Sequence, residues 1–385
     1  MAGAAFALSF RRSLAKAWGT KSLHTLAFET PQCLRPAPAL LSFSHSFYST
    51  KNMGYPTIKL SSGNEMPILG LGTWLSTNEN ELTAALKAAL DCGYRLIDTA
   101  FVYGNEAVIG KVLHEYFTNG KLKREDIFIT SKLPLTAHAP ADVEKVLKMQ
   151  LDALQLEYLD LYLVHCPVPF QKQGDTFDLA FVDGMQVPLT IDHVETWHAM
   201  EKLYDAGKVK ALGLSNFNTK QVQNVYDHAR IKPSNLQVEC HLYWPQTELF
   251  QLCKKLNMSL TAYGPLGSRG RTVFNEKMIW PEGDPLTDPL VKEFAEKYKK
   301  TTAQVLLRHL IQRGIAVIPK SVKPERVKEN FNVFDFTLSA QEMEKLDSIK
   351  KRTRLFLFDF AIKHPFYPFE DVDKSKVPVV SLQAK

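Results

Sequence analysis

Four ionisable residues of this sequence lie where chemistry could use them, at or just after the ends of apolar runs. Asp98, Lys132 and His165 each close such a run, and Tyr103 follows Asp98 by five positions. A charge at the end of a buried run must be either paired or used. Taken singly, an aspartate there is usually a helix cap, a lysine is usually solvated and a histidine is usually just hydrogen-bonded. Together, an acid, an ammonium, a phenol and an imidazole indicate one site equipped with general acid–base groups.

The apolar runs that carry these residues predict eight strands. Several are uninterrupted, as expected for parallel strands that are covered on both faces. The predicted strands span residues 69–73, 94–99, 127–132, 159–165, 209–215, 236–239, 260–263 and 315–319. Upstream, residues 57–60 and 65–68 flank a Ser-Ser-Gly-Asn turn and predict a small β-hairpin.

Amphipathic stretches between the strands predict helices, among them residues 79–91, 141–154, 194–205 and 219–228, the last capped by Asn218 or Thr219. Eight strands in repeating strand–helix order predict an α/β fold, a closed (β/α)₈ TIM barrel. The 385 residues suit a barrel of typically about 250 residues with additions. A Rossmann site is not expected, because Gly70-Leu71-Gly72 lacks the third glycine and the following helix. Chemistry in a barrel sits at the carboxyl ends of the strands, where the four residues lie.

Several segments extend the basic barrel. Residues 288–313 predict two helices, 339–351 a further helix, and 352–372 an aromatic-rich tail. No linker divides residues 57–351. We therefore expect one domain over residues 53–385, which includes a C-terminal loop, 352–385.

Composition excludes several classes of function. Hydrophobic residues make up 45% and charged residues 23%, a globular balance that excludes disorder as the main state. No run approaches the roughly 20 apolar residues of a membrane span, so no membrane partner is expected. Beyond residue 52, 41 basic residues face 40 acidic ones, which removes the electrostatic argument for nucleic acid. Five scattered cysteines without a CxxC pair predict neither a disulfide framework nor a metal site, and they fit a reducing compartment.

Residues 1–52 differ from the rest of the chain. They hold six basic residues and one acid, Glu29, and are rich in Ala, Ser, Leu and Phe. This composition is typical of a mitochondrial transit peptide, which would place the protein in the mitochondrial matrix. A disordered tail or a chain start at Met53, with a cytoplasmic protein, is the alternative. Whether the segment is cleaved stays open.

One stretch, Gly93-Tyr94-Arg95-Leu96-Ile97-Asp98-Thr99-Ala100 with Tyr103-Gly104-Asn105-Glu106 and Gly110, resembles the signature of the aldo-keto reductases. Gly70-Leu71-Gly72-Thr73-Trp74, Gly213-Leu214-Ser215-Asn216-Phe217 and Ile318-Pro319-Lys320-Ser321 are similar to other motifs of that family, in consistent order from about residue 57 to 372. The resemblance implies NADPH-dependent carbonyl reduction by a monomer, with Tyr103, Lys132, Asp98 and His165 as the catalytic tetrad.

The implied chemistry is physically coherent. A carbonyl that accepts hydride develops alkoxide character and must be protonated or stabilised. Tyr103 would be the acid, and the ammonium of Lys132 would favour phenolate and bring the pKa of Tyr103 closer to neutral. Asp98 would keep Lys132 charged, and His165 would direct the carbonyl oxygen. A family variant that reduces steroid double bonds has glutamate at the histidine position, so His165 favours reduction of C=O.

The resemblance also implies residues that bind the cofactor. At the nicotinamide end it assigns Ser215, Asn216 and Gln237 to the carboxamide and Tyr263 to the ring, and Leu266 and Ser268 to the loop over the pyrophosphate. At the adenosine end it assigns Lys320, Ser321, Arg326, Glu329 and Asn330. The basic pair Lys320 and Arg326 suits a 2′-phosphate and favours NADP(H) over NAD(H).

Departures from the family pattern bear on the substrate. The covering loop reads Gly267-Ser268-Arg269-Gly270-Arg271 and lacks the aspartate that some relatives close over the cofactor, so Arg269 or Arg271 is a candidate for a phosphate contact. Pro134 and Cys166 stand where sugar-type aldose reductases have tryptophans, which predicts a wider, less anion-selective pocket. Trp74, His165 and Cys166 are the expected substrate contacts.

The tail 352–372 would form a lid over this pocket. Within it, residues 354–360 are expected to face substrate and 364–369 to dock on the barrel. The leading hypothesis is therefore a reductase of apolar or aromatic aldehydes and ketones. Three alternatives stay open: a steroid-like ketone reductase, an NADPH-binding redox-sensing or structural protein with little turnover, and an aldolase or isomerase that uses Lys132 as a Schiff base. The sequence names neither the physiological substrate nor the direction of reaction.

Overall fold

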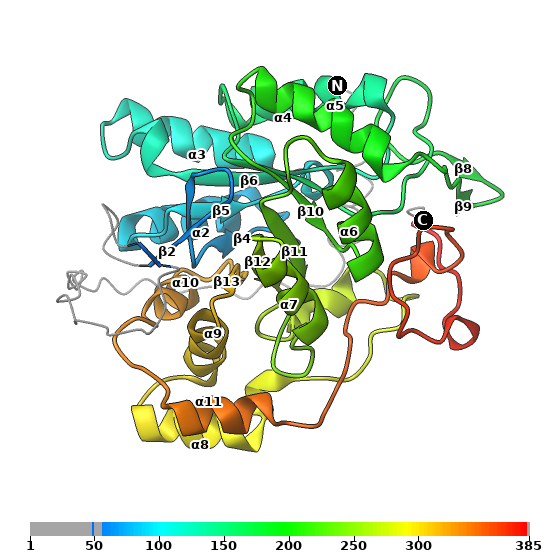
Figure 1. Ribbon diagram of the computed structural model, residues 1–385. Coiled ribbons are helices and arrows are strands. Elements are labelled where there is room, and N and C mark those ends of the chain that lie inside the picture. Colours follow the sequence, from blue (N-terminus) through cyan, green and yellow to red (C-terminus); the bar gives the residue numbers. More distant parts are fainter. Residues whose placement is uncertain (1–47, 50–55, 383–385) are drawn as a thin grey trace, which may run out of the picture.

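A closed barrel of eight parallel strands forms the centre of the molecule (Figure 1). The computed structural model describes residues 48–49 and 56–382. The barrel strands are β4 (Leu71–Gly72), β5 (Leu96–Asp98), β6 (Phe128–Leu133), β7 (Leu161–Val164), β10 (Leu212–Ser215), β11 (Asn235–Glu239), β12 (Ser259–Tyr263) and β13 (Ala316–Val317). They are hydrogen-bonded in chain order. The circle closes between β13 and the start of β4, where the Gly70 amide donates to the Val317 carbonyl at 2.9 Å.

Each barrel strand is followed by a helix, which confirms the predicted (β/α)₈ order. The barrel helices are α2 (Glu79–Cys92), α3 (Glu106–Thr118), α4 (Pro140–Leu154), α5 (His193–Asp205), α6 (Thr219–His228), α7 (Thr247–Lys255), α9 (Thr302–Gln312) and α10 (Pro324–Phe331). Local signals set their ends. The Asn218 side chain caps α6 and forms a reciprocal capping box with Gln221. Helix α2 begins at an Asn78 cap and ends at Gly93, which is left-handed with φ 112°.

Two added helices lie side by side outside the ring (Figure 1). Helix α8 (Pro289–Tyr298) packs on α11 (Ala340–Asp347), and the Glu342 carboxylate accepts from Tyr298 at 2.6 Å and pairs with Lys297 at 2.6 Å. The predicted helix 339–351 is shorter than expected, because α11 ends at Asp347. Beyond this end, Ile349 packs against an apolar cluster that holds residues of both helices.

A hairpin covers the amino end of the barrel. Strands β2 (Thr57–Lys59) and β3 (Glu65–Pro67) pair antiparallel as predicted, and β1 (Tyr48–Ser49) pairs with β2. The hairpin turn bonds to residues that precede strands β10 and β11, through Asn64 to the Lys210 carbonyl and Ser61 to Ser234. The carboxyl end of the barrel is thus the end left for a site. The transit-peptide prediction falls on residues 1–47 and 50–52, outside the described residues.

A second hairpin, which the sequence analysis missed, holds the C-terminal segment (residues 352–382). Strands β8 (Phe181–Val182) and β9 (Met185–Gln186) meet at Asp183-Gly184, and both turn residues have positive φ, a type that Asp-Gly favours. The Gln186 amide donates to the carbonyls of Phe360 and Val380. Figure 1 shows the hairpin beside this segment, which includes the short 3₁₀ turns η5 (Asp359–Ala361) and η6 (Lys374–Lys376). None of the helices described is long and apolar enough to cross a membrane.

Candidate functional site

The four predicted ionisable groups meet at the carboxyl end of the barrel. Asp98 ends β5, Lys132 lies in β6, His165 directly follows β7, and Tyr103 closes the 3₁₀ turn η1 (Phe101–Tyr103) after β5. The Lys132 ammonium lies 2.7 Å from Asp98 Oδ1 and 3.4 Å from the Tyr103 hydroxyl oxygen. The rings of Tyr103 and His165 are 5.7 Å apart in an edge-on arrangement. The neighbouring strands β5, β6 and β7 and the turn after β5 therefore contribute to a single cluster of four ionisable side chains.

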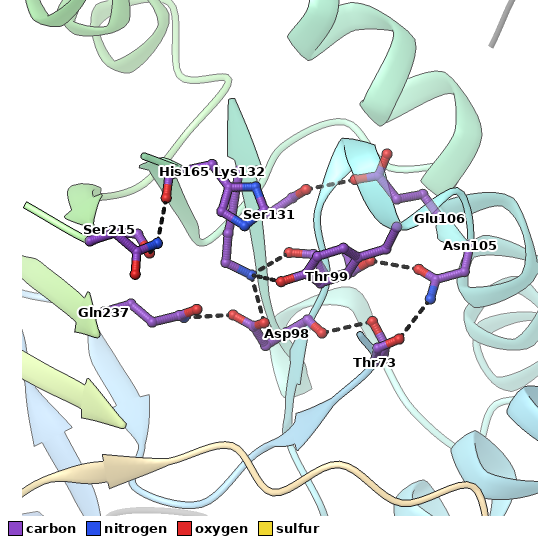
Figure 2. A network of polar contacts seen from close by, with 12 residues as sticks. Thr73, Asp98, Thr99, Asn105, Glu106, Ser131, Lys132, His165, Ser215 and Gln237 are labelled. Carbon is purple, nitrogen blue, oxygen red and sulfur yellow. Dashed lines mark hydrogen bonds and ion pairs between the residues drawn. The ribbon is translucent and has the colours of Figure 1, made fainter. Parts of the chain in front are cut away.

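Lys132 is fully buried and completely coordinated. Its ammonium donates to Asp98, to the Thr99 carbonyl at 2.8 Å and to the Tyr103 oxygen, which uses its three protons. Asp98 in turn accepts from Gln237 at 2.7 Å, and Figure 2 shows its side chain between Lys132 and Gln237. Burial lowers the pKa of Lys132, and the adjacent Asp98 carboxylate opposes that change. The carboxylate is what stabilises a charged lysine at this depth.

The pKa of Tyr103 departs from the prediction. Burial raises it well above the ordinary value of 10, and the nearby Asp98 and Cys166 raise it further. The expected lowering by Lys132 fails because the ammonium is already engaged by Asp98 and Thr99 and is 3.4 Å from the phenol. Tyr103 is thus a protonated phenol at neutral pH. It is equipped to give a proton rather than to take one.

His165 is neutral at physiological pH, because burial and the Lys132 charge lower its pKa well below 6.5. Its Nδ1 atom is buried and has no hydrogen-bond partner among the described residues. Leaving a lone pair there costs less than leaving an N–H there, which favours the tautomer with the proton on Nε2. A neutral imidazole of this kind can orient a polar group by donating a hydrogen bond without changing the charge of the site.

Behind the cluster lies a second buried network that the sequence analysis did not assign (Figure 2). The Glu106 carboxylate accepts from Ser131 at 2.6 Å and from Gln150 at 2.9 Å, and Gln150 accepts from Tyr162 at 2.8 Å. Burial raises the pKa of Glu106. Ser131 is the neighbour of Lys132 in β6, so the network fixes the strand that carries the ammonium. Glu106 belongs to the quoted signature, but its partners could be found only in three dimensions.

The residues expected to bind a nicotinamide lie next to the four groups. Asn216 has a left-handed backbone with φ 65°, and its amide donates to the His165 carbonyl at 2.8 Å and to Ser215 at 3.1 Å. The Tyr263 hydroxyl donates to the Asn216 side-chain oxygen at 2.8 Å. Gln237 contacts Asp98 directly. These contacts fix amide and hydroxyl groups beside an aromatic ring, which fits the carboxamide and ring of a nicotinamide.

The residues expected at the adenosine end follow β13. Lys320 and Ser321 precede α10, and the helix carries Arg326, Glu329 and Asn330. The side chains of Lys320 and Arg326 are exposed and line the cavity, and among the described residues neither forms an ion pair. Two cations outside any ion pair at a cavity wall fit an anionic phosphate.

A cavity of about 720 Å³ joins both groups of residues. Every predicted site residue lines it except Lys132, which stands behind Asp98 and Tyr103. The predicted residues that line it are Trp74, Asp98, Tyr103, His165, Cys166, Ser215, Asn216, Gln237, Tyr263, Leu266, Ser268, Lys320, Ser321, Arg326, Glu329 and Asn330. No cluster of potential metal ligands occurs in the described part of the chain.

Aromatic side chains form the remaining wall. Phe356, Phe358 and Phe360 of the C-terminal segment line the cavity as expected, and Phe356 contacts Trp74 with ring centroids 5.7 Å apart. Cys166 lies at the wall, and burial raises its thiol pKa to about 12. Tyr367 and Phe369 do not line the cavity and pack in an apolar cluster behind its wall, in agreement with the predicted docking role of residues 364–369. At this wall the cavity is therefore lined by Cys166 and by aromatic rings of the C-terminal segment.

Both arginines of the covering loop, which are candidates for a phosphate contact, bind protein groups in this structure. Arg269 pairs with Asp284 at 2.6 Å. Arg271 is buried and donates to the carbonyls of Gly267, Ser268 and Pro281. A buried guanidinium satisfies its donors on nearby backbone carbonyls when no acid is available. These residues hold the loop in shape.

A further unassigned residue, Glu239, attaches the C-terminal segment to the barrel. Its carboxylate is 1% exposed and accepts from the amides of Leu355 at 2.6 Å and Phe356 at 3.1 Å. The sequence signal was present, because Glu239 ends an apolar strand just as Asp98 does. Its partners in the C-terminal segment, more than a hundred residues away, gave no signal.

Comparison with known proteins agrees with this geometry. The sequence profile of the Aldo/keto reductase family matches residues 68–351. The bovine (Bos taurus) aldo-keto reductase family 1 member A1 is 44% identical over 332 residues, which cover 83% of this chain and 99% of that protein. The zebrafish (Danio rerio) member A1-A is 46% identical over 325 residues, 81% of this chain and 98% of that protein. The solved aldose reductase of Schistosoma japonicum superposes with a TM-score of 0.75 at 44% identity, covering 82% of this chain and 99% of that one. The chain therefore belongs to the aldo/keto reductase family and is a nicotinamide-nucleotide-dependent oxidoreductase that acts on carbonyl and alcohol groups.

Proposed function

We propose that this enzyme reduces aldehydes and ketones to alcohols with NADPH, that Tyr103 supplies the proton, and that apolar or aromatic carbonyls are its preferred substrates. The observation that carries the proposal is the contact between the Tyr103 phenol and the Lys132 ammonium at the wall of the cavity. The proton geometry follows from it. Lys132 donates to the phenol oxygen, so the phenol hydrogen stays available to a carbonyl oxygen in the cavity.

The bound nucleotide would supply hydride to the carbonyl carbon, and the protein controls everything around that transfer. Tyr103 holds a proton at its hydroxyl because burial and Asp98 raise its pKa. As negative charge develops on the carbonyl oxygen, the phenol can pass its proton on and the adjacent ammonium of Lys132 stabilises the resulting phenolate. His165 orients the carbonyl oxygen through its Nε2–H. Asp98 keeps Lys132 charged throughout.

The preference for the phosphorylated nucleotide rests on charge. Lys320 and Arg326 form no ion pair among the described residues, and both line the cavity. A 2′-phosphate carries up to about two negative charges, which would complement this pair, whereas the 2′-hydroxyl of NADH would leave it unsatisfied.

The preference for apolar or aromatic carbonyls rests on the residues that line the cavity. Trp74, Phe177, Phe356 and Phe358 line the cavity, and the cations that line it are Arg269, Lys323, Lys320 and Arg326. Arg269 is neutralised by Asp284, and the other three belong to the segment that follows β13. Among the described residues, the C-terminal segment lines the cavity with Phe356, Phe358 and Phe360 and with no cation, which disfavours an anionic substrate there. Steroid-like ketones, which are large and apolar, are a second candidate class for the same reason.

The proposal is tested by NADPH oxidation in the presence of 4-nitrobenzaldehyde and of glucose. We expect a strong preference for nitrobenzaldehyde, and NADPH preferred over NADH. Tyr103→Phe should still bind NADPH, seen by fluorescence, and should lose turnover by at least about a hundred-fold, the contribution typical of a general acid. Preference for glucose would contradict the assigned substrate class, and unchanged turnover of Tyr103→Phe would remove Tyr103 as the acid.

The remaining proposals concern the whole chain. We expect a monomer, and transport into mitochondria directed by residues 1–52 stays a proposal from composition alone. A fluorescent fusion of the full chain, compared with a chain that starts at Met53, would test the second point.

A further inference from the structure

A buried carboxylate outside the reacting cluster joins two segments that cover the cavity. Asp359 lies in η5 of the C-terminal segment, and its side chain is fully buried. Its Oδ2 accepts the amide of Ile279 at 2.6 Å, and its Oδ1 has no hydrogen-bond partner in another described residue. Burying a carboxylate with so few partners costs free energy. The position of this acid in an otherwise aromatic segment therefore calls for a role.

Ile279 lies in a longer stretch, residues 267–286, which begins with the five residues of the covering loop and forms one side of the cavity. The whole stretch is called the covering loop from here on. Ser268, Phe274, Met278 and Trp280 of this loop line the cavity together with the residues expected to bind the nucleotide. Ser268 is the residue assigned to the pyrophosphate by family resemblance. The Asp359 carboxylate thus attaches the C-terminal segment to the loop that lies over the proposed nucleotide.

Other contacts join the same two segments. Trp280 of the loop meets Phe356 with ring centroids 5.9 Å apart, and Asn275 donates to the Ser381 carbonyl at 3.3 Å. A Cβ added to Gly283 would lie 2.9 Å from a Leu355 side-chain carbon, so the backbone of the loop is packed directly on the C-terminal segment. Asp359 contributes the only charged contact between them in the described part of the chain.

Inside the covering loop, Arg271 connects the part near Ile279, which Asp359 binds, to the part near Ser268, which is expected to cover the nucleotide. Its guanidinium donates to Pro281, two residues from Ile279, at 2.6 Å. It also donates to the carbonyls of Gly267 at 2.9 Å and Ser268 at 3.2 Å. A displacement of Ile279 would therefore be transmitted to Ser268 through hydrogen bonds of one buried side chain.

We propose that Asp359 is a positioning residue that holds the covering loop over the bound nucleotide, so that the C-terminal segment controls nucleotide release as well as substrate access. This inference rests on the proposed binding of NADPH and goes beyond it. Asp359 itself touches neither nucleotide nor substrate. Its effect should appear in the dissociation rate of the nucleotide, not in hydride transfer.

The test uses the full-length protein and NADPH, with bound NADPH displaced by excess NADP+ and its fluorescence followed by stopped flow. Asp359→Ala removes the acceptor of the Ile279 amide, and the dissociation rate should rise about ten-fold, as expected for loss of a hydrogen bond to a charged group. Asp359→Asn keeps one acceptor oxygen but loses the charge, and it should raise the dissociation rate by about three-fold. Asp373→Asn, an exposed cap in the same segment, is the matched control and should leave the rate unchanged.

A single-turnover measurement of hydride transfer in the same variants completes the design, and its rate should be unchanged. If Asp359→Ala fails to fold, the three-fold change in Asp359→Asn decides. A variant that melts at lower temperature but releases NADPH at the wild-type rate would show a merely structural role and overturn the inference. If the wild-type protein bound no NADPH, the proposed function would fail and the inference with it; if the wild type bound NADPH and all variants released it equally, the inference alone would fail.

Discussion

Burial decides the protonation state of the phenol at the centre of this site. Two charged groups lie beside Tyr103, the Lys132 ammonium and the Asp98 carboxylate. They act on the pKa of the phenol in opposite directions. With the ammonium held mainly by the carboxylate, desolvation dominates and the pKa of Tyr103 rises. Reduction needs the protonated phenol, which is the predominant form of Tyr103 at neutral pH. Oxidation of an alcohol must begin from the rare phenolate.

The two directions should therefore respond differently to pH. Below the raised pKa of Tyr103, the phenolate fraction grows about ten-fold per pH unit. We expect kcat/KM for oxidation of benzyl alcohol with NADP+ to rise from pH 7 to pH 9 by up to that factor per unit, while reduction of benzaldehyde shows no such rise. Steady-state rates in a constant-ionic-strength buffer measure both. Tyr103→Phe serves as the background, and parallel profiles in the two directions would contradict the assignment.

At the residue scale, the sequence predicted those side chains whose signal is local. Asp98, Lys132 and His165 were found because each ends an apolar run. Glu106 and Asp359 were not, because each acts through partners that only folding brings near, at Gln150 and Ile279. The sign of the Tyr103 pKa shift was wrong for the same reason. The competition between Asp98 and the phenol for one ammonium depends on distances that a sequence does not contain.

At the scale of elements, a glycine sets how closely two helices approach, and those helices carry the site. Helix α3 follows the turn that ends at Tyr103, and α4 follows the strand of Lys132. A Cβ on Gly110 of α3 would lie 2.5 Å from the Ala153 carbonyl oxygen and 2.7 Å from that of Leu154 in α4. Both are backbone atoms, which cannot move aside as a flexible side chain would. The glycine thus fixes the spacing of these two helices.

Gly110→Ala should destabilise the protein even though alanine is the better helix former by about 1 kcal/mol. Overpacking against the α4 backbone should lower the free energy of unfolding by about 2 kcal/mol, and kcat should fall because Tyr103 and Lys132 shift relative to each other. Urea unfolding and steady-state rates measure the two effects. Gly270→Ala is the stability control, since a Cβ there meets open space, and its unfolding free energy should change by less than about 0.5 kcal/mol. A more stable Gly110→Ala protein would refute the packing argument.

Element prediction succeeded where periodicity and capping agree. The range 219–228 for α6 was predicted to the residue because Asn218 caps it and the apolar face is regular. The order of eight strands followed from apolar runs, but the runs 69–73 and 315–319 are longer than the two-residue strands β4 and β13 that they contain. The hairpin β8–β9 was missed, although Asp183-Gly184 marked its turn, because its strands have two residues each.

At the scale of the whole molecule, the fold buries several histidines in neutral form. Burial lowers the pKa of His138 to about 3, with His193 and His364 contributing as neighbours. Burial also lowers the pKa values of His165, His193, His309 and His364. In the unfolded chain these imidazoles recover an ordinary pKa of about 6.5. Folding is therefore linked to the release of protons over a range close to physiological pH.

The sign of the linkage predicts acid sensitivity. Below pH about 6.5 the unfolded chain binds more protons than the folded one, so the free energy of unfolding falls as pH falls, by up to about 1.4 kcal/mol per pH unit for each such histidine. The carboxyls of Glu106 and Asp160 have raised pKa values and act in the opposite direction at lower pH, so the interval from 7.5 to 5.5 isolates the histidines best. Urea unfolding of the full chain at pH 7.5, 6.5 and 5.5 should show this loss.

One buried histidine can be replaced to test how many protons the chain takes up on unfolding. Both ring nitrogens of His138 lack partners among the described residues, so an apolar residue of similar size should be accepted there. His138→Met should make the pH dependence shallower by about one proton, because the substituted chain takes up one proton fewer on unfolding at pH 5.5. His114→Gln, at an exposed position, should keep the wild-type slope. Two results would show that the buried imidazoles do not stay neutral in the folded protein. One is a pH dependence of the unfolding free energy that is unchanged in His138→Met. The other is a wild-type unfolding free energy that does not change from pH 7.5 to 5.5.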